Sequence, residues 1–241
     1  MGERPEPNNA LGVDLTPGRV QLVLDVAVLA QPRIEGEAVV PLGPSERALF
    51  AEMPWPLRRS EWLAGRKVAK ALLRALGFSP DRVEILPLAS GAPAIHLDGA
   101  PHSTLTLSLS HTRRWAVAAV AQGRVGVDAC DLADGHRLAH IGPRVFSDGE
   151  AEACGAHRST RHQASVWALK EAALKLDQGG IFDPGAKSVT VASLEPARLT
   201  HPRLDVALAR LPDAAVAVAR PPGSSLKAGT LPQVLLDEVQ L

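Results

Sequence analysis

Apolar residues recur along the chain at two spacings, and each spacing predicts one kind of secondary structure. Recurrence every three or four positions predicts amphipathic helices over Arg58–Gly77, with Gly77 as the closing residue, and from about Ser159 to Gln178. Short apolar runs rich in Val predict strands. The strand candidates are Val20–Ala30, Val83–Leu88, Pro93–Leu97, Ser103–Ser110, Trp115–Ala121, Arg124–Leu132, Ser188–Leu194, Arg203–Leu211 and Ala214–Arg220.

The order of these elements predicts two related halves. A short helix is expected at Ser45–Met53 with Ser45 as its N-cap, and a polar segment at Phe146–Cys154. One long helix followed by a small set of strands occurs twice, although no residue-level repeat accompanies it. The pattern favours an α+β fold of two pseudo-symmetric halves. Because Gly123 interrupts the strand pattern, we place the boundary there, with an N-terminal half over residues 1–122 and a C-terminal half over residues 123–241.

Composition narrows the class of protein. Of the 241 residues, 46% are hydrophobic and 22% are charged, as in soluble globular proteins. The 26 basic residues balance 26 acidic ones, so neither nucleic acid nor a membrane is expected as a partner. Two cysteines are too few for a disulfide framework, and no apolar run could form a secretory signal or span a bilayer. We therefore expect a cytoplasmic protein.

The stretch Val166–Leu176 aligns three unlike side chains on one side of its predicted helix. Trp167, Glu171 and Lys175 follow one another at steps of four, beside an apolar stripe of Leu169, Ala172, Ala173 and Leu176. An exposed Glu–Lys pair at this spacing is the simpler interpretation, and it would contribute a few tenths of a kcal/mol. A polar side that faces a cleft is the other.

Three further groups could carry chemistry. Asp128 ends an apolar strand, where it either caps a turn or supplies a hard oxygen ligand for Mg²⁺. Ser108, Ser110 and His111 precede two arginines, Arg113 and Arg114, and this set is either structural or a cradle for phosphate. Arg66, Lys67 and Lys70 form a basic stripe that either faces solvent or binds phosphates or an acidic partner.

Four segments together resemble the Sfp-type 4′-phosphopantetheinyl transferases. They are WLAGRKVAKALLRALG, SLSH, VGVD and WALKEAALK, in the order seen in that family, and the resemblance covers roughly residues 58–175. It implies a monomer of two α+β halves with the active site at their interface. It also implies transfer of 4′-phosphopantetheine from coenzyme A to a serine of an acidic acyl or peptidyl carrier protein, with release of adenosine 3′,5′-bisphosphate.

The resemblance assigns roles to individual residues. Asp128 and Glu171 would hold Mg²⁺, or Mn²⁺, against the diphosphate of coenzyme A, and Glu171 would help to take the proton from the carrier serine. Lys175 would bind phosphate oxygens and complete the catalytic set with Asp128 and Glu171. Coenzyme A contacts are also implied for Arg66, Lys70, Ser110, His111 and Lys170, with His111 near the 3′-phosphate. Trp167 and Lys170 would position the helix, and Glu150 would orient the site from outside it.

Two positions depart from the family pattern. Cys130 stands where many members carry a second acid, and a neutral thiol is a poor ligand for Mg²⁺. Strand alternation turns Asp131 to the opposite side, so we expect weaker metal binding. Ala92 stands where many relatives carry a basic residue, which removes a contact worth roughly 1.5–3 kcal/mol.

Three hypotheses follow from the sequence. The first is an active phosphopantetheinyl transferase. The second is a degenerate or repurposed member that binds coenzyme A or carrier protein without efficient transfer, as Cys130 and Ala92 would allow. The third is a generic Mg²⁺-dependent nucleotide-binding domain.

Overall fold

The computed structural model describes residues 13–33, 40–147, 149–153, 159–176, 187–201 and 204–222. The helices are α1 Pro44–Ala51, α2 Pro56–Ala75, α3 Gly135–Val145, α4 Glu150–Ala153 and α5 Thr160–Leu176, with 3₁₀ turns at Pro80–Arg82 and Leu132–Asp134. The strands are β1 Val13–Asp14, β2 Val20–Val23, β3 Val26–Pro32, β4 Val83–Pro87, β5 Pro93–Leu97, β6 Ala100–Pro101, β7 Leu105–His111, β8 Trp115–Gln122, β9 Gly126–Asp131, β10 Thr190–Leu194, β11 Ala197–His201, β12 Asp205–Leu211 and β13 Ala214–Arg220.

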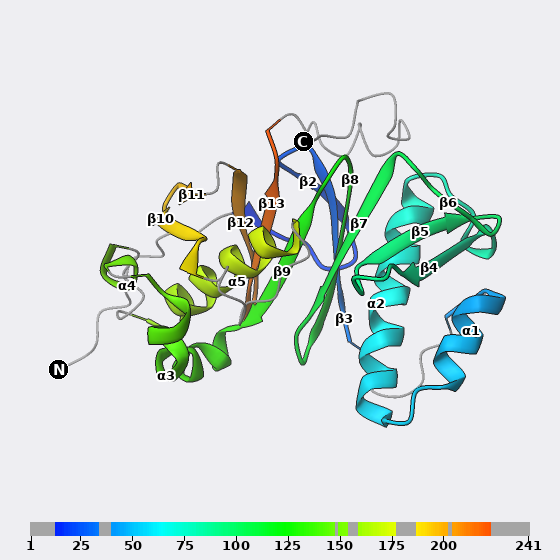
Figure 1. The fold of residues 1–241 in the computed structure, drawn as a ribbon, viewed down its shortest axis with the longest axis horizontal. Helices are drawn as coiled ribbons and strands as arrows, with labels where there is room; N and C mark the ends of the chain where they lie inside the picture. Colours follow the sequence, from blue (N-terminus) through cyan, green and yellow to red (C-terminus); the bar gives the residue numbers. More distant parts are fainter. Residues whose placement is uncertain are drawn as a thin grey trace.

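Two four-stranded sheets pack face to face between the two long helices (Figure 1). The first sheet has the order β2-β3-β8-β7 and is covered by α2, whereas the second has the order β1-β12-β13-β9 and is covered by α5. Smaller sheets, β4-β5-β6 and β10-β11, lie beside the two halves of this sandwich. The layers confirm the predicted α+β fold class.

The central strands are apolar throughout because both of their faces are buried. On β8, Ala116 and Ala118 pack toward α2, while Val117 and Ala119 pack toward the other sheet. The strand β13 repeats this arrangement, with its alternate residues packed toward α5 and toward the first sheet. Strands buried on both faces lose the alternation of apolar and polar residues. Small Ala side chains at these positions let the layers approach closely.

The two four-stranded sheets are built from successive parts of the chain with one exception, and the division into halves at residue 123 stays a prediction. β8 ends at Gln122 and β9 begins at Gly126, so the chain passes from one sheet to the other near the predicted boundary. The short strand β1, however, pairs in parallel with β12 of the second sheet. The N-terminal segment therefore crosses into the C-terminal layer. The pseudo-symmetry of the two halves stays a prediction.

Two predicted elements are corrected by turn geometry. The single strand expected over Val20–Ala30 is a hairpin of β2 and β3, because Leu24 and Asp25 both have positive φ values of 53° and 56°. Ser45 does not cap α1, since the helix begins at Pro44 and Gly43 is the N-cap. The Ser45 backbone N–H instead donates to Glu84 Oε1 at 2.7 Å.

Several elements were not predicted, namely the helices α3 and α4, the short strands β1 and β6, and the strand β11. Helix α3 contains Gly142 and Pro143, both unfavourable inside helices, which obscured its apolar spacing of Leu138, Ile141 and Val145. The long helices agree with prediction, and Gly77 follows α2 with a φ of 92°, although the expected end of the second helix at residues 177–178 lies outside the described residues. Within the described ranges, no helix is long and apolar enough to cross a membrane.

Candidate active site

The side of α5 that carries Trp167, Glu171 and Lys175 faces the line along which β7 of the first sheet meets β9 of the second, which we call the seam. From Ala164 to Leu176, the partly exposed residues are Trp167, Glu171 and Lys175, and the residues between them are buried. The predicted stripe at steps of four is therefore the accessible side of an otherwise buried helix. Lys175 does not serve the simple surface pair considered above, since its ammonium lies 2.8 Å from Asp128 Oδ1 on β9.

Gly126 explains how α5 comes so close to β9. A Cβ atom at this position would lie 1.9 Å from the backbone oxygen of Ala172, far inside any allowed contact. Glu171 immediately precedes Ala172. The absence of a side chain at Gly126 therefore lets α5 approach β9 closely next to Glu171. Strand alternation then turns Asp128 toward the same helix.

Asp128 is held by two donors on its Oδ1 atom. The Ser110 hydroxyl donates at 2.8 Å and Lys175 Nζ donates at 2.8 Å. Lys175 Nζ also donates to the carbonyl oxygens of Leu109 at 3.2 Å and Val127 at 2.9 Å. These three acceptors match the three donors of an ammonium group. The predicted phosphate contact of Lys175 would require one of these hydrogen bonds to be exchanged.

Two serine hydroxyls join β7 to β9. The backbone N–H of Val127 donates to Ser108 Oγ at 2.9 Å, and that of Ala129 donates to Ser110 Oγ at 3.0 Å. Both serines are buried. Ser110 was predicted to contact coenzyme A phosphate, but its hydroxyl is engaged with Asp128 and Ala129 in this seam, which makes it a support for the metal-type aspartate.

Glu171 is electrostatically coupled to Asp128. Burial, and secondly the negative charge of Asp128, raise the pKa of Glu171 to about 7, against the opposing effect of Lys175. A divalent cation would relieve the repulsion between the two carboxylates. Among the described residues no group of three or more His, Cys, Asp or Glu is placed to hold a metal. A pair of carboxylates still suits Mg²⁺, which completes its shell with water and substrate phosphates.

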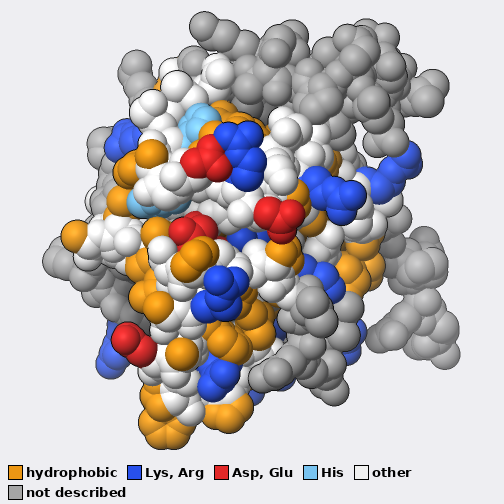
Figure 2. Space-filling view, turned by 90° about the vertical axis from the view of Figure 1, so that its right-hand side faces the viewer, with side chains coloured by type: hydrophobic (Ala, Val, Ile, Leu, Met, Phe, Trp, Pro, Cys, Tyr) orange, Lys and Arg blue, Asp and Glu red, His pale blue; other side chains and the backbone are white. Residues whose placement is uncertain are grey.

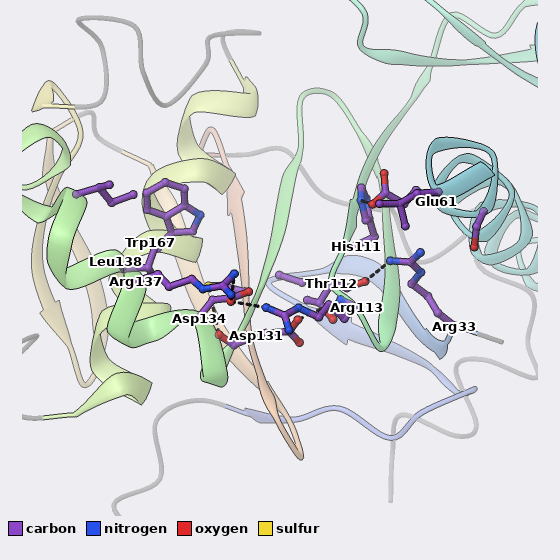
Figure 3. A pocket seen from close by; sticks show the side chains of 15 residues that line it. Arg33, Glu61, His111, Thr112, Arg113, Asp131, Asp134, Arg137, Leu138 and Trp167 are labelled. Carbon is purple, nitrogen blue, oxygen red and sulfur yellow. Dashed lines mark hydrogen bonds and ion pairs between the residues drawn. The ribbon is translucent and has the colours of Figure 1, made fainter. Parts of the chain in front are cut away.

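A cavity of about 860 Å³ opens beside these residues (Figure 3). One side carries the donors of Arg33, His111 and Arg113 next to the acid Glu61, and the opposite side includes Trp167 and Cys130. Arg33 is held there by donating to the Thr112 carbonyl oxygen at 2.6 Å. Arg33 and Arg113 present guanidinium groups here, and Arg113 Nη2 lies 2.8 Å from Asp134 Oδ1 in the same cavity. Guanidinium donors on this wall suit an anionic ligand.

His111 reaches the cavity in contact with an acid from α2. His111 Nε2 lies 3.4 Å from Glu61 Oε1. Burial lowers the pKa of His111, and the charge of Glu61 opposes that effect. Neither Arg33 nor Glu61 was predicted as a site residue, because each is separated in sequence from the SLSH segment and only the fold brings them together.

A second cavity of about 270 Å³ lies on the other side of the seam. Ala92 and Lys175 both line it, as do Ser108 and Leu109. Ala92, one of the two positions that depart from the family pattern, thus lines the same cavity as Lys175, the predicted catalytic lysine. On β9, Asp128 lies between Val125, which lines the second cavity, and Cys130, which lines the first. On α5, Glu171 lies in the same way between Lys175 of the second cavity and Trp167 of the first.

Two members of the predicted basic stripe on α2, Arg66 and Lys70, are buried, whereas Lys67 is partly exposed. Lys70 is buried and its Nζ lies 2.7 Å from Glu46 Oε2 of α1, while Arg66 is buried over the Trp62 ring and donates to the Ile85 carbonyl oxygen at 3.1 Å. Burial lowers the pKa of Arg66 to about 10. The interpretation of a solvated stripe is wrong for Arg66 and Lys70, neither of which lines the described cavities, and their predicted contacts with coenzyme A stay predictions. The α2 residues at the large cavity are Leu57, Ser60 and Glu61.

The Lys170 side chain is also inaccessible to a ligand in this structure. It has no exposed surface, and its Nζ lies 2.8 Å from Glu150 Oε2. The structure gives Lys170 a structural contact, and its predicted contact with coenzyme A stays a prediction. Glu150 pairs with the residue that precedes Glu171, and its predicted role as a support from outside the site also stays a prediction.

Cys130 faces α5 together with Asp128. It packs in the core cluster that contains α5 residues, and burial followed by the charge of Asp128 raises the pKa of its thiol. Asp131 instead accepts a hydrogen bond from the backbone N–H of Arg113 at 3.1 Å. The predicted alternation of these two side chains is thus present in the strand.

Comparisons with known proteins bear on the identity of the chain. A family model for the 4′-phosphopantetheinyl transferase N-terminal domain matches residues 45–121. A holo-[acyl-carrier-protein] synthase of Geobacillus kaustophilus is 42% identical over 102 residues, which cover 37% of this chain and 76% of the relative. The 4′-phosphopantetheinyl transferase AcpT of Salmonella typhi is 31% identical over 160 residues, which cover 61% of this chain and 78% of the relative.

These matches make the protein a transferase, and they also identify its family. The chain belongs to the 4′-phosphopantetheinyl transferase family. The predicted family is confirmed at this level, and the narrower Sfp type stays a prediction.

Proposed function

We propose that the protein transfers the 4′-phosphopantetheine moiety of coenzyme A to a serine of an acyl or peptidyl carrier protein, with Mg²⁺ or Mn²⁺ as cofactor. The observation that carries this proposal is the placement of Asp128 and Glu171 on facing elements, near enough for the charge of one to raise the pKa of the other. The name of the Geobacillus relative supports an acyl carrier protein as acceptor. A monomeric state and a cytoplasmic location stay predictions.

The proposed step is a displacement at phosphorus. The serine oxygen forms a bond to the phosphorus that carries pantetheine, and the bond from that phosphorus to the bridging oxygen breaks. The bridging oxygen leaves with adenosine 3′,5′-bisphosphate. The serine proton passes to Glu171, directly or through one water. A carboxyl group with a pKa of about 7 is suited to accept a proton near neutral pH.

Asp128 and Glu171 would hold the divalent cation. When bound, Mg²⁺ would neutralise the diphosphate and the charge that develops on the leaving oxygen. Lys175 and Ser110 fix one oxygen of Asp128, so the carboxylate is oriented before substrate binds. The protein contributes mainly position and electrostatic stabilisation, as is usual for this type of transfer.

The wall of the large cavity that carries these guanidinium donors would receive the remaining phosphate of coenzyme A. Arg33, His111 and Arg113 line it together. The cavity volume of about 860 Å³ lies in the range of sites for small molecules and cofactors. Three donors on one side of such a space favour a multiply charged anion over a neutral ligand.

A second candidate function is binding of coenzyme A or carrier protein without efficient transfer. It is favoured by Cys130, which faces the same helix as Asp128, and by Ala92, which lines the cavity beside Lys175. Each replaces a charged group that many relatives carry.

A transfer assay separates the two functions. Purified protein, Mg²⁺, coenzyme A and a panel of apo-carrier proteins are incubated, and the carriers are weighed by mass spectrometry. Addition of one phosphopantetheine, lost in Glu171→Gln, supports transfer. Coenzyme A binding by calorimetry, with no modified carrier in the panel, would instead favour the binding function.

A further inference from the structure

We infer that the corner between α1 and α2 is the surface on which the acidic carrier protein docks, an inference that rests on the proposed function. This corner, formed by Trp55, Leu57, Arg58 and Arg59, lies at the start of α2. None of these side chains belongs to the carboxylate site described above.

The corner exposes two large apolar side chains that lie two residues apart. Trp55 is 72% exposed and Leu57 is 68% exposed. Within the described ranges, four large hydrophobic side chains are exposed in this way, and the remaining two are Val13 and Leu88. Exposed aromatic residues beside arginine are the composition of binding hot spots.

The backbone that presents Trp55 is rigid. Prolines flank it at positions 54 and 56, and each fixes its own φ and restricts the preceding residue to extended conformations. Trp55 has φ −100° and ψ 121°, and its carbonyl oxygen accepts a hydrogen bond from the Arg59 N–H at 3.0 Å. Because the loop is already ordered, binding a partner here costs little conformational entropy.

The corner is continuous with the mouth of the large cavity. Leu57 lines that cavity, followed one turn later by Ser60 and Glu61. A protein seated on Trp55 and Leu57 would therefore extend over the opening that leads toward Trp167. Trp167 lies one turn before Glu171 on α5, so this opening offers an acceptor serine a path toward the proposed base.

The charges presented around this mouth are positive. Arg58, Arg113 and Arg137 have side chains 65%, 64% and 66% exposed, whereas their acidic neighbours Glu61 and Asp134 are 22% and 29% exposed. The acids lie deeper, so an approaching surface meets guanidinium groups first. Figure 2, which views the side of the molecule that carries α1 and β4–β6, shows hydrophobic side chains at its lower edge, where Figure 1 places the α1–α2 connection, with both basic and acidic side chains above them.

These features point to an acidic partner with an apolar spot. The arginines would steer and orient it, and Trp55 with Leu57 would supply the contact area that slows its release. A chain with equal numbers of acidic and basic residues thus gains a local surface for an anionic protein.

The test uses two variants with matched controls. Trp55→Ser removes the aromatic anchor and Arg58→Glu reverses the outermost charge. Val13→Ser and Arg198→Glu make the same changes at exposed positions on β1 and β11. Initial transfer rates are measured against apo-carrier and, separately, against coenzyme A. Binding of a carrier whose acceptor serine is replaced by alanine is followed by calorimetry, so that recognition is measured without transfer.

Trp55→Ser and Arg58→Glu are each expected to weaken carrier binding and to raise the carrier KM by roughly tenfold or more. The coenzyme A KM and the melting temperature should change little, and both controls should behave as the parent. Transfer with an unchanged carrier KM in both variants would overturn the docking surface and leave the proposed function standing. If the parent shows no transfer while the variants still weaken carrier binding, the proposed function is overturned and the docking surface stands. Concentration-dependent dimerisation abolished by Trp55→Ser would assign the corner to a second copy and overturn the inference.

Discussion

Lys170 Nζ lies 2.8 Å from Glu150 Oε2, and neither side chain has any exposed surface. The other half contains an equivalent pair, in which Lys70 Nζ lies 2.7 Å from Glu46 Oε2. The remaining contacts of the two pairs also match. Glu46 accepts a hydrogen bond from the backbone N–H of Ile85, and Lys70 donates to the carbonyl oxygen of Val83, two residues before Ile85. Glu150 likewise accepts from the backbone N–H of Val191, and Lys170 donates to the carbonyl oxygen of Val189. Each pair therefore fixes its long helix to a strand of the same half.

We predict that Lys170→Met and Lys70→Met both destabilise the fold, because each leaves a carboxylate buried without its cation. The expected loss is about 3–5 kcal/mol, measured by urea unfolding. Lys170 precedes Glu171, so only Lys170→Met should also raise the Mg²⁺ concentration needed for half-maximal transfer. Equal Mg²⁺ dependence in the two variants, assayed well below their melting temperatures, would contradict a positioning role for Lys170.

Gly126→Ala should separate α5 from β9. The added methyl group would meet the Ala172 carbonyl oxygen at 1.9 Å, so the helix must move. We expect a loss of about 1–3 kcal/mol in unfolding free energy and a large loss of transfer activity. The control is Gly65→Ala in α2, where the nearest atom would lie 3.6 Å away and alanine favours the helix. That variant should be neutral or slightly stabilised, and a similar response of both variants would argue against close approach as the reason for Gly126.

Cys130→Asp should strengthen the metal site. The side chain faces α5 with Asp128, and a carboxylate there is a far better ligand for Mg²⁺ than a thiol. We expect half-maximal transfer at a several-fold lower Mg²⁺ concentration. Cys130→Ser is the control for size and polarity and should leave the Mg²⁺ dependence near that of the parent. An unchanged Mg²⁺ dependence in a folded Cys130→Asp protein would show that this position does not contact the cation.

Glu171 should make stability depend on pH in the absence of divalent cations. Its pKa of about 7 in the folded protein lies above the value of an unfolded glutamate, so the folded state holds its proton over a wider range. As pH rises through that window, the unfolded state ionises first and the free energy of unfolding falls. Melting temperatures measured from pH 5 to 8 should therefore decline more for the parent than for Glu171→Gln. Identical curves would contradict the raised pKa.

The rate of transfer should rise with pH, whereas stability should fall. A general base must be ionised, so the rate should increase as pH rises toward and beyond about 7. Saturating Mg²⁺ favours the carboxylate and should move this increase to lower pH. The measurement is a pH–rate profile at two Mg²⁺ concentrations, and coincident profiles would count against Glu171 as a ligand of the cation.

The sequence was informative where local chemistry decides structure. The spacing of Trp167, Glu171 and Lys175 predicted the accessible side of α5, because a helix places residues four apart on one side whatever surrounds it. Alternation likewise predicted that Cys130 and Asp128 share a face of β9. The fold class rested on the same local periodicities, whereas the motif order rested on the resemblance to a known family.

Tertiary structure alone decided which charges are available to a ligand. Arg66, Lys70 and Lys170 are cations in the sequence, but the fold buries them against Ile85, Glu46 and Glu150. Contacts between distant segments also created features that no pattern announces, such as the Glu61–His111 pair. Periodicity specifies the side of an element on which a residue lies, whereas the partner across that side depends on how separate elements pack.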